Sequence, residues 1–573
     1  MDIGIWGIID KDNKTINYEQ FCGAKKNGHQ LFNSYIYIDY KSSGKFSDDC
    51  VYDINADSCI IFDGVLLNKR SLFSRYHCNC MKSLIETMYQ KNGKLFFDEF
   101  RGSFCGVYYD TKEKCTIIFN DHLSNKPLFY YQDNNYFIFA SKVQYITDYL
   151  KQFKKIHLNI KGAYCLLSYA YMYSDFTLFE EVKRLTPGNY LLIQNNQVQI
   201  KKFYEIGKTQ FIQISDREAV NRIDALFCSA VKQQAEKNME YHYSNYAPLS
   251  AGLDSRMTVY TLKRLGFDNV INFTYSQTGE FDHQIPGKIS GELGYRWIFK
   301  NLNNGLDLYN IDEAVNLADT LIYFAWPAQL NDMMSLLNTA NMGIVHTGVL
   351  GDVIIGTYAN HTKHKDYQIG DGAYSHRLIQ KVPAMSDQSE RSLYPNYEIG
   401  MLYNRAMNGA CLGYTTTFSQ YTEALSPFMD VDLFDFCMSL PFAQRYQHKL
   451  YYNWVKTYYP AAAKHTHNGI KISNTKLQIP IKGKRIGIDT ISSRFRVYFK
   501  SRVSKSYGMN PFQYWYNTNQ KLRIIFDTYF NCHIDLLSQY NELYKDAKDL
   551  YLTGNATEKI LCLSLIGSLK SFM

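Results

Sequence analysis

The sequence has no long apolar segment, no C-x-x-C motif and little proline. No run of about 18 uncharged apolar residues occurs, so we expect no membrane span. The N-terminus has no basic region followed by an apolar core, which predicts no secretory signal and a cytoplasmic location. The 13 cysteines are scattered without a C-x-x-C pair, which argues against a zinc framework and favours reduced thiols.

A strong charge of either sign is also missing. The net charge of +8 is modest for 573 residues and is spread along the chain. Basic clusters at 482–485 and 494–505 have no recognised nucleic-acid motif around them, so a solvated basic surface is favoured over nucleic-acid binding. The composition, with 46% hydrophobic and 20% charged residues, is typical of a folded soluble protein, and the length allows two or three domains.

Short β-branched and aromatic runs fill roughly the first 205 residues. Turn residues bound these runs, which we interpret as strands: Ile3–Ile9, Ser34–Ile38, Ser58–Phe62, Phe104–Asp110, Cys115–Asn120, Phe137–Ser141 and Asn189–Gln194. Many short strands with few helices predict packed sheets. Beyond a predicted helix at Ala219–Lys237, the pattern changes to alternating strands and helices, which predicts a doubly wound parallel sheet in an α/β fold.

The stretch Pro248–Arg256 is the strongest candidate for the chemical centre. A short apolar run ends in small and hydroxylated residues and is followed by a predicted helix. Gly252 lets the backbone approach a ligand, Ser250 and Ser255 supply hydroxyl donors, and the first N–H groups of the helix suit an anion such as pyrophosphate. Asp254 fits an anion site if Mg²⁺ bridges it to the phosphates. An ordinary turn with a Ser/Asp helix cap is the alternative.

Four segments near the N-terminus carry a family resemblance, in order and at plausible spacing: Phe62–Asn68, Arg101–Asp110, Asn120–Tyr130 and Phe139–Lys142. They are similar to the F-N-G-E-I-Y-N, G-x-F-A-x-x-x-x-D, R-D-x-x-G-x-K-P-L-Y-Y and F-A-S-E segments of class II glutamine amidotransferase domains. This set resembles the N-terminal half of an asparagine synthetase-like protein. The resemblance implies an Ntn-hydrolase-type αββα sandwich over residues 1–205.

Departures from the family pattern imply that glutamine hydrolysis is lost. The family's glutaminase uses a cysteine directly after the initiator methionine, and the freed α-amino group helps to activate the thiol. Position 2 is Asp2, and the nearest cysteine is Cys22. Asp63 and Val65 replace the Asn and Glu that handle glutamine, and Asn120 replaces the Arg of R-D. We therefore expect this fold to be kept without glutaminase activity.

A second set of motifs resembles the synthetase half of the same family. Ser250–Ser255 is similar to S-G-G-x-D-S, the pyrophosphate loop of ATP pyrophosphatases. Val345–Tyr358 resembles S-G-E-G-x-D-E-x-x-x-G-Y, and Leu425–Pro441 resembles a further, mainly structural element. Val349 and Val353 replace the two glutamates of the second motif. In relatives the first of these glutamates helps to activate the nucleophile, so no residue of this sequence is assigned to that role.

The resemblance implies an ATP site. Asp254 and Asp352 would be catalytic and would hold Mg²⁺, although a helix cap is the alternative for Asp352. Contacts with ATP would come from Leu249, Ser250, Gly252, Asp254, Ser255, Tyr275, Thr347 and Gly348. Relatives have a lysine that stabilises charge on the acyl-adenylate. His467 stands in its place, and Lys464 and Lys471 are nearby; Lys471 is the catalytic candidate, with a surface role as the simpler interpretation.

The pattern is similar to a divergent asparagine synthase-related branch. Residues 215–573 would form a PP-loop ATP pyrophosphatase domain with many helices. We expect an AMP-forming amide ligase that uses ATP and Mg²⁺ to join a carboxylate, whether a small molecule or linked to a peptide or glycan, to an amine acceptor. We expect the protein to have no glutaminase activity of its own and to bind neither nucleic acid nor a membrane. A homodimer is compatible with the sequence. A glutamine-hydrolysing asparagine synthetase and a silent ATP-binding scaffold are the alternatives.

Overall fold

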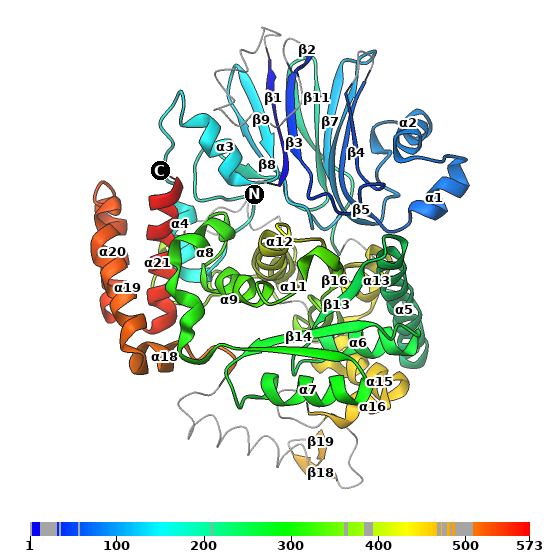
Figure 1. Cartoon of the computed structure of the whole chain (residues 1–573), viewed down its shortest axis with the longest axis vertical. Helices are drawn as coiled ribbons and strands as arrows, with labels where there is room; N and C mark the ends of the chain where they lie inside the picture. Colours follow the sequence, from blue (N-terminus) through cyan, green and yellow to red (C-terminus); the bar gives the residue numbers. More distant parts are fainter. Residues whose placement is uncertain are drawn as a thin grey trace.

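Two six-stranded antiparallel sheets form the N-terminal part of the chain (Figure 1). The structure is a computed structural model that describes residues 3–11, 31–33, 36–54, 58–207, 210–359, 365–382, 394–466, 472, 478–481, 484–487 and 508–572. The first sheet, in spatial order, consists of β10 (Lys183–Arg184), β8 (Phe129–Gln132), β9 (Tyr136–Ala140), β1 (Gly4–Asp10), β3 (Ile36–Lys41) and β2 (Leu31–Asn33). The second consists of β12 (Gln197–Lys202), β11 (Asn189–Gln194), β7 (Cys115–Asn120), β6 (Gly102–Asp110), β5 (Ser58–Leu66) and β4 (Val51–Ile54).

The two sheets pack face to face because successive side chains of a strand point to opposite faces of its sheet, and both faces are apolar. In β5, Ile61 joins the core between the sheets, whereas Phe62 joins a second core under the helices α1 (Lys69–Tyr76) and α2 (Met81–Asn92). On the other side, α3 (Val143–Leu150) and α4 (Ile160–Tyr169) share a core with the first sheet. The layers therefore run helix, sheet, sheet, helix, and the predicted αββα sandwich is confirmed.

A five-stranded parallel sheet lies below the sandwich (Figure 1). Its spatial order is β15 (Arg296–Asn301), β14 (Val270–Ser276), β13 (Ser244–Pro248), β16 (Met342–His346) and β17 (Ala424–Leu425). The chain first adds strands on one side of β13, through α6 (Asp254–Arg264) and α7 (Phe281–Leu293), and later returns on the other side as β16. This reversal opens a crevice at the carboxyl ends of β13 and β16, where doubly wound sheets bind ligands.

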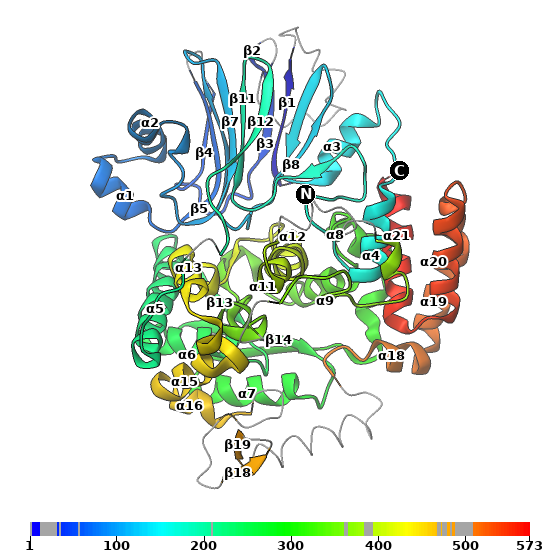
Figure 2. The ribbon, with the colours of Figure 1, turned by 180° about the vertical axis from the view of Figure 1, so that it is seen from behind.

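Helices make up most of the remaining chain. They include α5 (Asp216–Glu240), α8 (Ile311–Ala318), α9 (Ala325–Met334), α11 (Tyr397–Met401), α12 (Leu412–Phe418), α13 (Val431–Ser439), α14 (Phe442–Arg445), α15 (Lys449–Tyr458), α16 (Pro460–Lys464), α18 (Phe512–Thr518), α19 (Gln520–His533), α20 (Asn541–Thr553) and α21 (Ala556–Phe572). The C-terminal helix α21 packs against α4 and α8, on the flank seen in Figure 2. None of the described helices has the length and apolarity needed to cross a membrane.

The local signals for α5 hold in the structure. Ser215 is its N-cap, and the Ser215 hydroxyl accepts a hydrogen bond from the backbone N–H of Glu218 at 3.1 Å. The helix is longer than the predicted Ala219–Lys237 because it includes the polar first turn after the cap. The last strand of the sandwich ends at Lys202 and α5 begins at Asp216, while the predicted division into 1–205 and 215–573 stays a prediction.

Candidate functional site

The crevice at the carboxyl ends of β13, β14 and β16 forms a cleft of about 360 Å³. Three segments that are distant in sequence form most of its walls: the loop after β13 with the start of α6, the end of β14 and the loop after β16. Asp282, Tyr414 and Met509 complete the lining. The predicted site residues among its lining are Leu249, Ser250, Gly252, Asp254, Ser255, Tyr275, Gly348 and Asp352. The structure therefore brings most of the predicted ATP-site residues into one cleft.

The loop 249–253 is fixed by its own hydrogen bonds. These are Ser250 N–H to Ser255 Oγ (3.0 Å), Gly252 N–H to Ser250 Oγ (3.1 Å), Ala251 N–H to Asp282 Oδ1 (2.7 Å) and Arg256 Nη2 to the Ala251 carbonyl (2.9 Å). The buried Arg256 also donates to the Thr466 carbonyl at 2.7 Å, so it anchors the loop to the segment after α16. A loop that is ordered in this way loses little conformational entropy when a ligand binds.

Two glycines of the cleft have different reasons to be glycine. A Cβ on Gly252 would meet only Ser250 Oγ, at 3.1 Å, so the chain's own packing leaves free space there. A Cβ on Gly348 would lie 2.4 Å from the backbone N of Ser255 and 2.6 Å from the carbonyl carbon of Asp254. Gly348 therefore allows the loop after β16 to touch the start of α6, while Gly252 leaves room for a ligand.

We predict that Gly348→Ala weakens MgATP binding by about tenfold, because the added methyl forces apart the two loops that carry Asp254 and Asp352. Titration with a fluorescent ATP analogue measures the affinity, and thermal unfolding measures the strain in the fold. Gly252→Ala is the control for the strain, since its methyl meets only Ser250 Oγ, at 3.1 Å, and should lower the unfolding temperature less than the methyl of Gly348→Ala. Wild-type MgATP affinity in Gly348→Ala would contradict the close-approach role.

Asp254 and Asp352 face each other across the two loops. Their side chains are close enough to hydrogen-bond, and burial together with the Asp352 carboxylate raises the pKa of Asp254 well above its ordinary value. The Tyr451 hydroxyl donates to Asp254 at 2.6 Å, and the Thr357 hydroxyl donates to Asp352 at 2.5 Å. Two carboxylates held together in this way suit a divalent cation, which removes their mutual repulsion.

The helix-cap alternative is wrong for both aspartates. The residue that caps α6 is Leu253, which makes no side-chain cap hydrogen bond, and Asp254 is already the first residue of the helix. Asp352 precedes the π-helical segment η5 (Val353–Thr357) and likewise makes no cap hydrogen bond. Both carboxylates are therefore free of a capping role and available to the cleft.

The contact shell of Asp352 includes a residue that the sequence did not single out. Thr357 Oγ1, which donates to Asp352, lies 2.9 Å from His448 Nε2. Burial lowers the pKa of His448, which favours a neutral ring. Because Thr357 has one hydroxyl proton and gives it to Asp352, the neutral ring donates from Nε2 to Thr357. No local motif predicts these two hydrogen bonds, since His448 lies at the start of another helix, α15.

Some predicted residues lie elsewhere. Thr347 is buried beside the cleft and does not line it, because its backbone N–H pairs with the Leu425 carbonyl at 2.9 Å. Lys464 is exposed at the end of α16, away from the residues that line the cleft. Lys471 and His467 fall outside the described residues. Within the described part of the chain, no three His, Cys, Asp or Glu side chains form a metal cluster, so other oxygen ligands would have to complete a site at Asp254 and Asp352.

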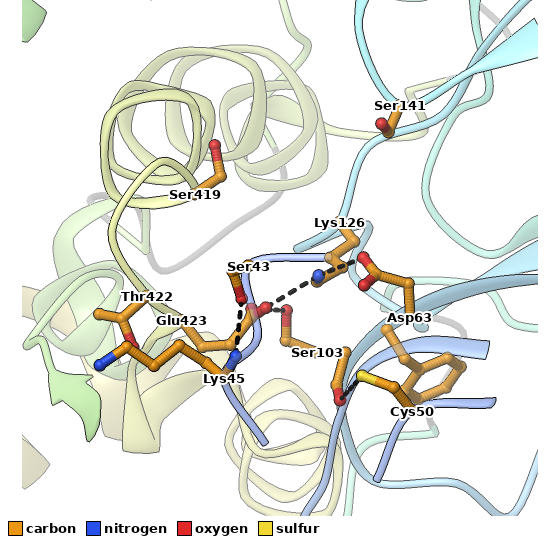
Figure 3. A network of polar contacts seen from close by, with 12 residues as sticks. Ser43, Lys45, Cys50, Asp63, Ser103, Lys126, Ser141, Ser419, Thr422 and Glu423 are labelled. Atoms are coloured by element: carbon orange, nitrogen blue, oxygen red, sulfur yellow. Dashed lines mark hydrogen bonds and ion pairs between the residues drawn. The ribbon is translucent and has the colours of Figure 1, made fainter. Parts of the chain in front are cut away.

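A second pocket lies where the sandwich meets the rest of the molecule (Figure 3). Lys126 Nζ lies 2.6 Å from Asp63 and 2.8 Å from Glu423, a residue just before β17. The Ser103 hydroxyl donates to Glu423 at 3.1 Å, and the Tyr52 hydroxyl donates to Asp63 at 2.7 Å. Burial by itself would lower the pKa of Lys126, but the two carboxylates outweigh it and hold the pKa well above its ordinary value.

The cysteines near this pocket are poor nucleophiles. Burial and the Asp63 carboxylate raise the pKa of Cys50 to about 12 and that of Cys105 well above its ordinary value. Both thiols are therefore protonated near neutral pH, and the thiolate is the reactive form. Val65, at the position where the family has a glutamate, is fully buried. Asp2 and Cys22 fall outside the described residues.

Comparison with known proteins gives matches to the sandwich and to the synthetase family. Residues 50–204 match the glutamine amidotransferase domain family. A Methanocaldococcus jannaschii protein, provisionally named glutamine-hydrolyzing asparagine synthetase 2, is 24% identical over 233 residues, which are 40% of this chain and 44% of that protein. The match thus spans less than half of the relative's length.

Two solved structures align with parts of the chain at 11% identity and low TM-scores. One, described as the allosteric regulatory enzyme of purine biosynthesis, aligns with 52% of this chain and 74% of its own, with a TM-score of 0.23. The other, the glutamine phosphoribosylpyrophosphate amidotransferase of B. subtilis complexed with ADP and GMP, aligns with 72% and 90%, with a TM-score of 0.24. The fold assignment rests on the sheets described above. The sequence matches thus place residues 50–204 in the glutamine amidotransferase domain family and show that part of the chain is similar to a protein provisionally named as an asparagine synthetase.

Proposed function

We propose that this protein is an ATP-dependent, AMP-forming amide ligase that joins a carboxylate to an amine. The observation that carries the proposal is the convergence of Asp254, Asp352 and the loop 249–253 in one cleft at the carboxyl ends of parallel strands. An ordered loop beside the start of a helix suits pyrophosphate, and paired carboxylates suit its magnesium ion. The family match supports a ligase or amidotransferase in general terms.

In the proposed reaction, a carboxylate oxygen of the substrate attacks the α-phosphorus of ATP, and the bond to the bridging oxygen breaks to release pyrophosphate. An amine nitrogen then attacks the acyl carbon, AMP leaves, and one proton is released. Mg²⁺, when bound by Asp254 and Asp352, neutralises charge on the pyrophosphate. Ser250 and Ser255 offer hydroxyls to the phosphates, and Tyr451 and Thr357 fix the orientation of the two carboxylates.

The second candidate is a glutamine-hydrolysing asparagine synthetase. The match of residues 50–204 to glutamine amidotransferase domains and the name of the M. jannaschii relative favour it. The side chains at the pocket between the sandwich and the parallel sheet argue against glutamine hydrolysis. Asp63 is held by Lys126 and Tyr52, Val65 cannot hydrogen-bond a substrate, and the described cysteines at the pocket have raised thiol pKa values. We therefore propose that amines other than glutamine-derived ammonia are used.

We expect the purified protein with MgATP and a suitable carboxylic acid to exchange labelled pyrophosphate into ATP, and to form no glutamate from glutamine above the uncatalysed rate. A known glutaminase serves as the positive control for the second measurement. Glutamate formation that depends on this protein would replace the proposal by the second candidate. MgATP binding without exchange, across acids of several shapes, would instead support a silent ATP-binding scaffold.

A further inference from the structure

A second cavity adjoins the proposed ATP cleft. It encloses about 260 Å³, and Val349 and Asp352 line both spaces. A group placed in this cavity would therefore lie beside Asp352, which also borders the cleft. The carboxylate to be activated must meet the phosphates of ATP at such a junction, so the cavity is the natural place for the rest of that substrate.

The walls of this cavity are mainly aromatic. The rings that line it belong to Tyr171, Tyr323, Trp326, Tyr358 and Tyr374. Part of the remaining wall comes from the π-helical segment η8 (Leu402–Cys411), which contributes four residues, and from Val353 of the π-helical segment η5. Small residues of η8, among them Ala406 and Gly409, leave the space open. π-helical turns occur frequently at functional sites, and aromatic walls suit a flat or apolar ligand body.

Arg405, in η8, is the one cation among the residues that line this cavity. Its Nη1 lies 3.4 Å from the Gly372 carbonyl, and its guanidinium lies 5.6 Å from the centre of the Tyr374 ring. No carboxylate in the described part of the chain forms an ion pair with it. Arg445, by contrast, is fully buried and paired with Glu398. The Arg405 guanidinium is thus available to bind an external anion in a forked geometry.

We propose that the carboxylic acid substrate carries a second anionic group bound by Arg405 and an apolar or aromatic body, and that it has no free ammonium group. This inference rests on the proposed ligase function. Asp352 is the one acid that lines the cavity, and it is hydrogen-bonded by Thr357 and faces Asp254. An ammonium group in the cavity would therefore have no carboxylate partner, which disfavours a free amino acid and favours an N-acylated or peptide-embedded acid.

Three acids with the same reacting carboxylate test this substrate class. N-benzoyl-L-aspartate has the aromatic body, the second carboxylate and no ammonium group. N-benzoyl-β-alanine lacks only the second carboxylate, and free L-aspartate lacks the aromatic body and keeps the ammonium group. We expect pyrophosphate exchange with N-benzoyl-L-aspartate to have a kcat/KM about tenfold above that with N-benzoyl-β-alanine, with L-aspartate lowest.

The variant R405Q should remove the tenfold preference by slowing exchange with N-benzoyl-L-aspartate alone, and R405K should keep part of it. Calorimetric titration with N-benzoyl-L-aspartate gives the same comparison without catalysis. Equal exchange with the two benzoyl acids, or R405Q that equals wild type in both measurements, overturns the inference and leaves the ligase function standing. Binding that depends on Arg405 without exchange by any of the three acids supports the anion site and counts against adenylation.

Discussion

Asp254→Asn should lower pyrophosphate exchange on the order of a thousandfold, and Asp352→Asn should do the same. Each change keeps the shape of the side chain and removes one negative charge from the proposed magnesium site. The loss of charge stabilisation at the leaving pyrophosphate is comparable to the loss of a main electrostatic contact in other active sites, which costs about a hundredfold to a thousandfold. Exchange of labelled pyrophosphate into ATP with N-benzoyl-L-aspartate measures the effect.

The same variants should not destabilise the fold. Asp254 is crowded by Asp352, and its pKa is raised well above the ordinary value by burial and by that neighbour. A group with a raised carboxyl pKa contributes less stability as the pH rises, so a neutral amide at this position keeps or increases the unfolding temperature near pH 7. MgATP should raise that temperature in the wild type and not in Asp254→Asn.

Asp430→Asn is the matched control for a buried aspartate outside the cleft. Asp430 caps α13 through a 3.0 Å hydrogen bond from the backbone N–H of Leu433, and burial raises the pKa of its carboxyl to about 6. Asparagine is also a good cap, so this variant should keep both its stability and its exchange activity. Full exchange in Asp254→Asn, with Asp430→Asn behaving as expected, would rule out the magnesium role of Asp254.

The sequence was sufficient for those features that depend on local pattern. Runs of β-branched and aromatic residues such as Ser58–Phe62 predicted strands and packed sheets, and the family resemblance added the helices that cover them. In the structure Ile61 and Phe62 lie on opposite faces of β5. The order of small, hydroxylated and acidic residues from Ser250 to Ser255 likewise indicated a loop at the start of a helix. Asp352 could be paired with Asp254 in advance because Val345–Tyr358 resembles the second motif of the synthetase family, and two carboxylates on separate loops suit magnesium pyrophosphate.

Contacts between distant segments could not be predicted, since no local spacing encodes them. Tyr451 reaches Asp254 across 197 residues, and His448 reaches Thr357 across 91. Thr347 was expected to contact ATP, but the pairing of β16 with β17 directs its backbone to Leu425 and buries its side chain. Arg405 lies in a π-helical segment, whose extra residue shifts the helical phase, so a period of 3.6 does not indicate which way it faces.

Lys126→Met should destabilise the protein by about 3 kcal/mol, because it leaves Asp63 and Glu423 in the pocket without their cation. The three side chains are 17%, 10% and 18% exposed, so water relieves only part of the repulsion. Chemical denaturation near pH 7 measures the loss.

Two further variants separate a buried charge network from a simple loss of packing. Lys82→Met removes the more exposed ion pair with Asp53, at 2.9 Å, and should change stability by about 0.5 kcal/mol or less. The triple variant Lys126→Met, Asp63→Asn, Glu423→Gln replaces both orphaned carboxylates by neutral amides and should recover most of the loss. Glu423 belongs to the segment before β17 and Asp63 to β5, so recovery would show that the loss in Lys126→Met comes from two unpaired carboxylates where the sandwich meets the parallel sheet. A triple variant as unstable as Lys126→Met would instead assign the effect to the packing of the lysine side chain, and the pocket would then tolerate neutral polar groups no better than unpaired acids.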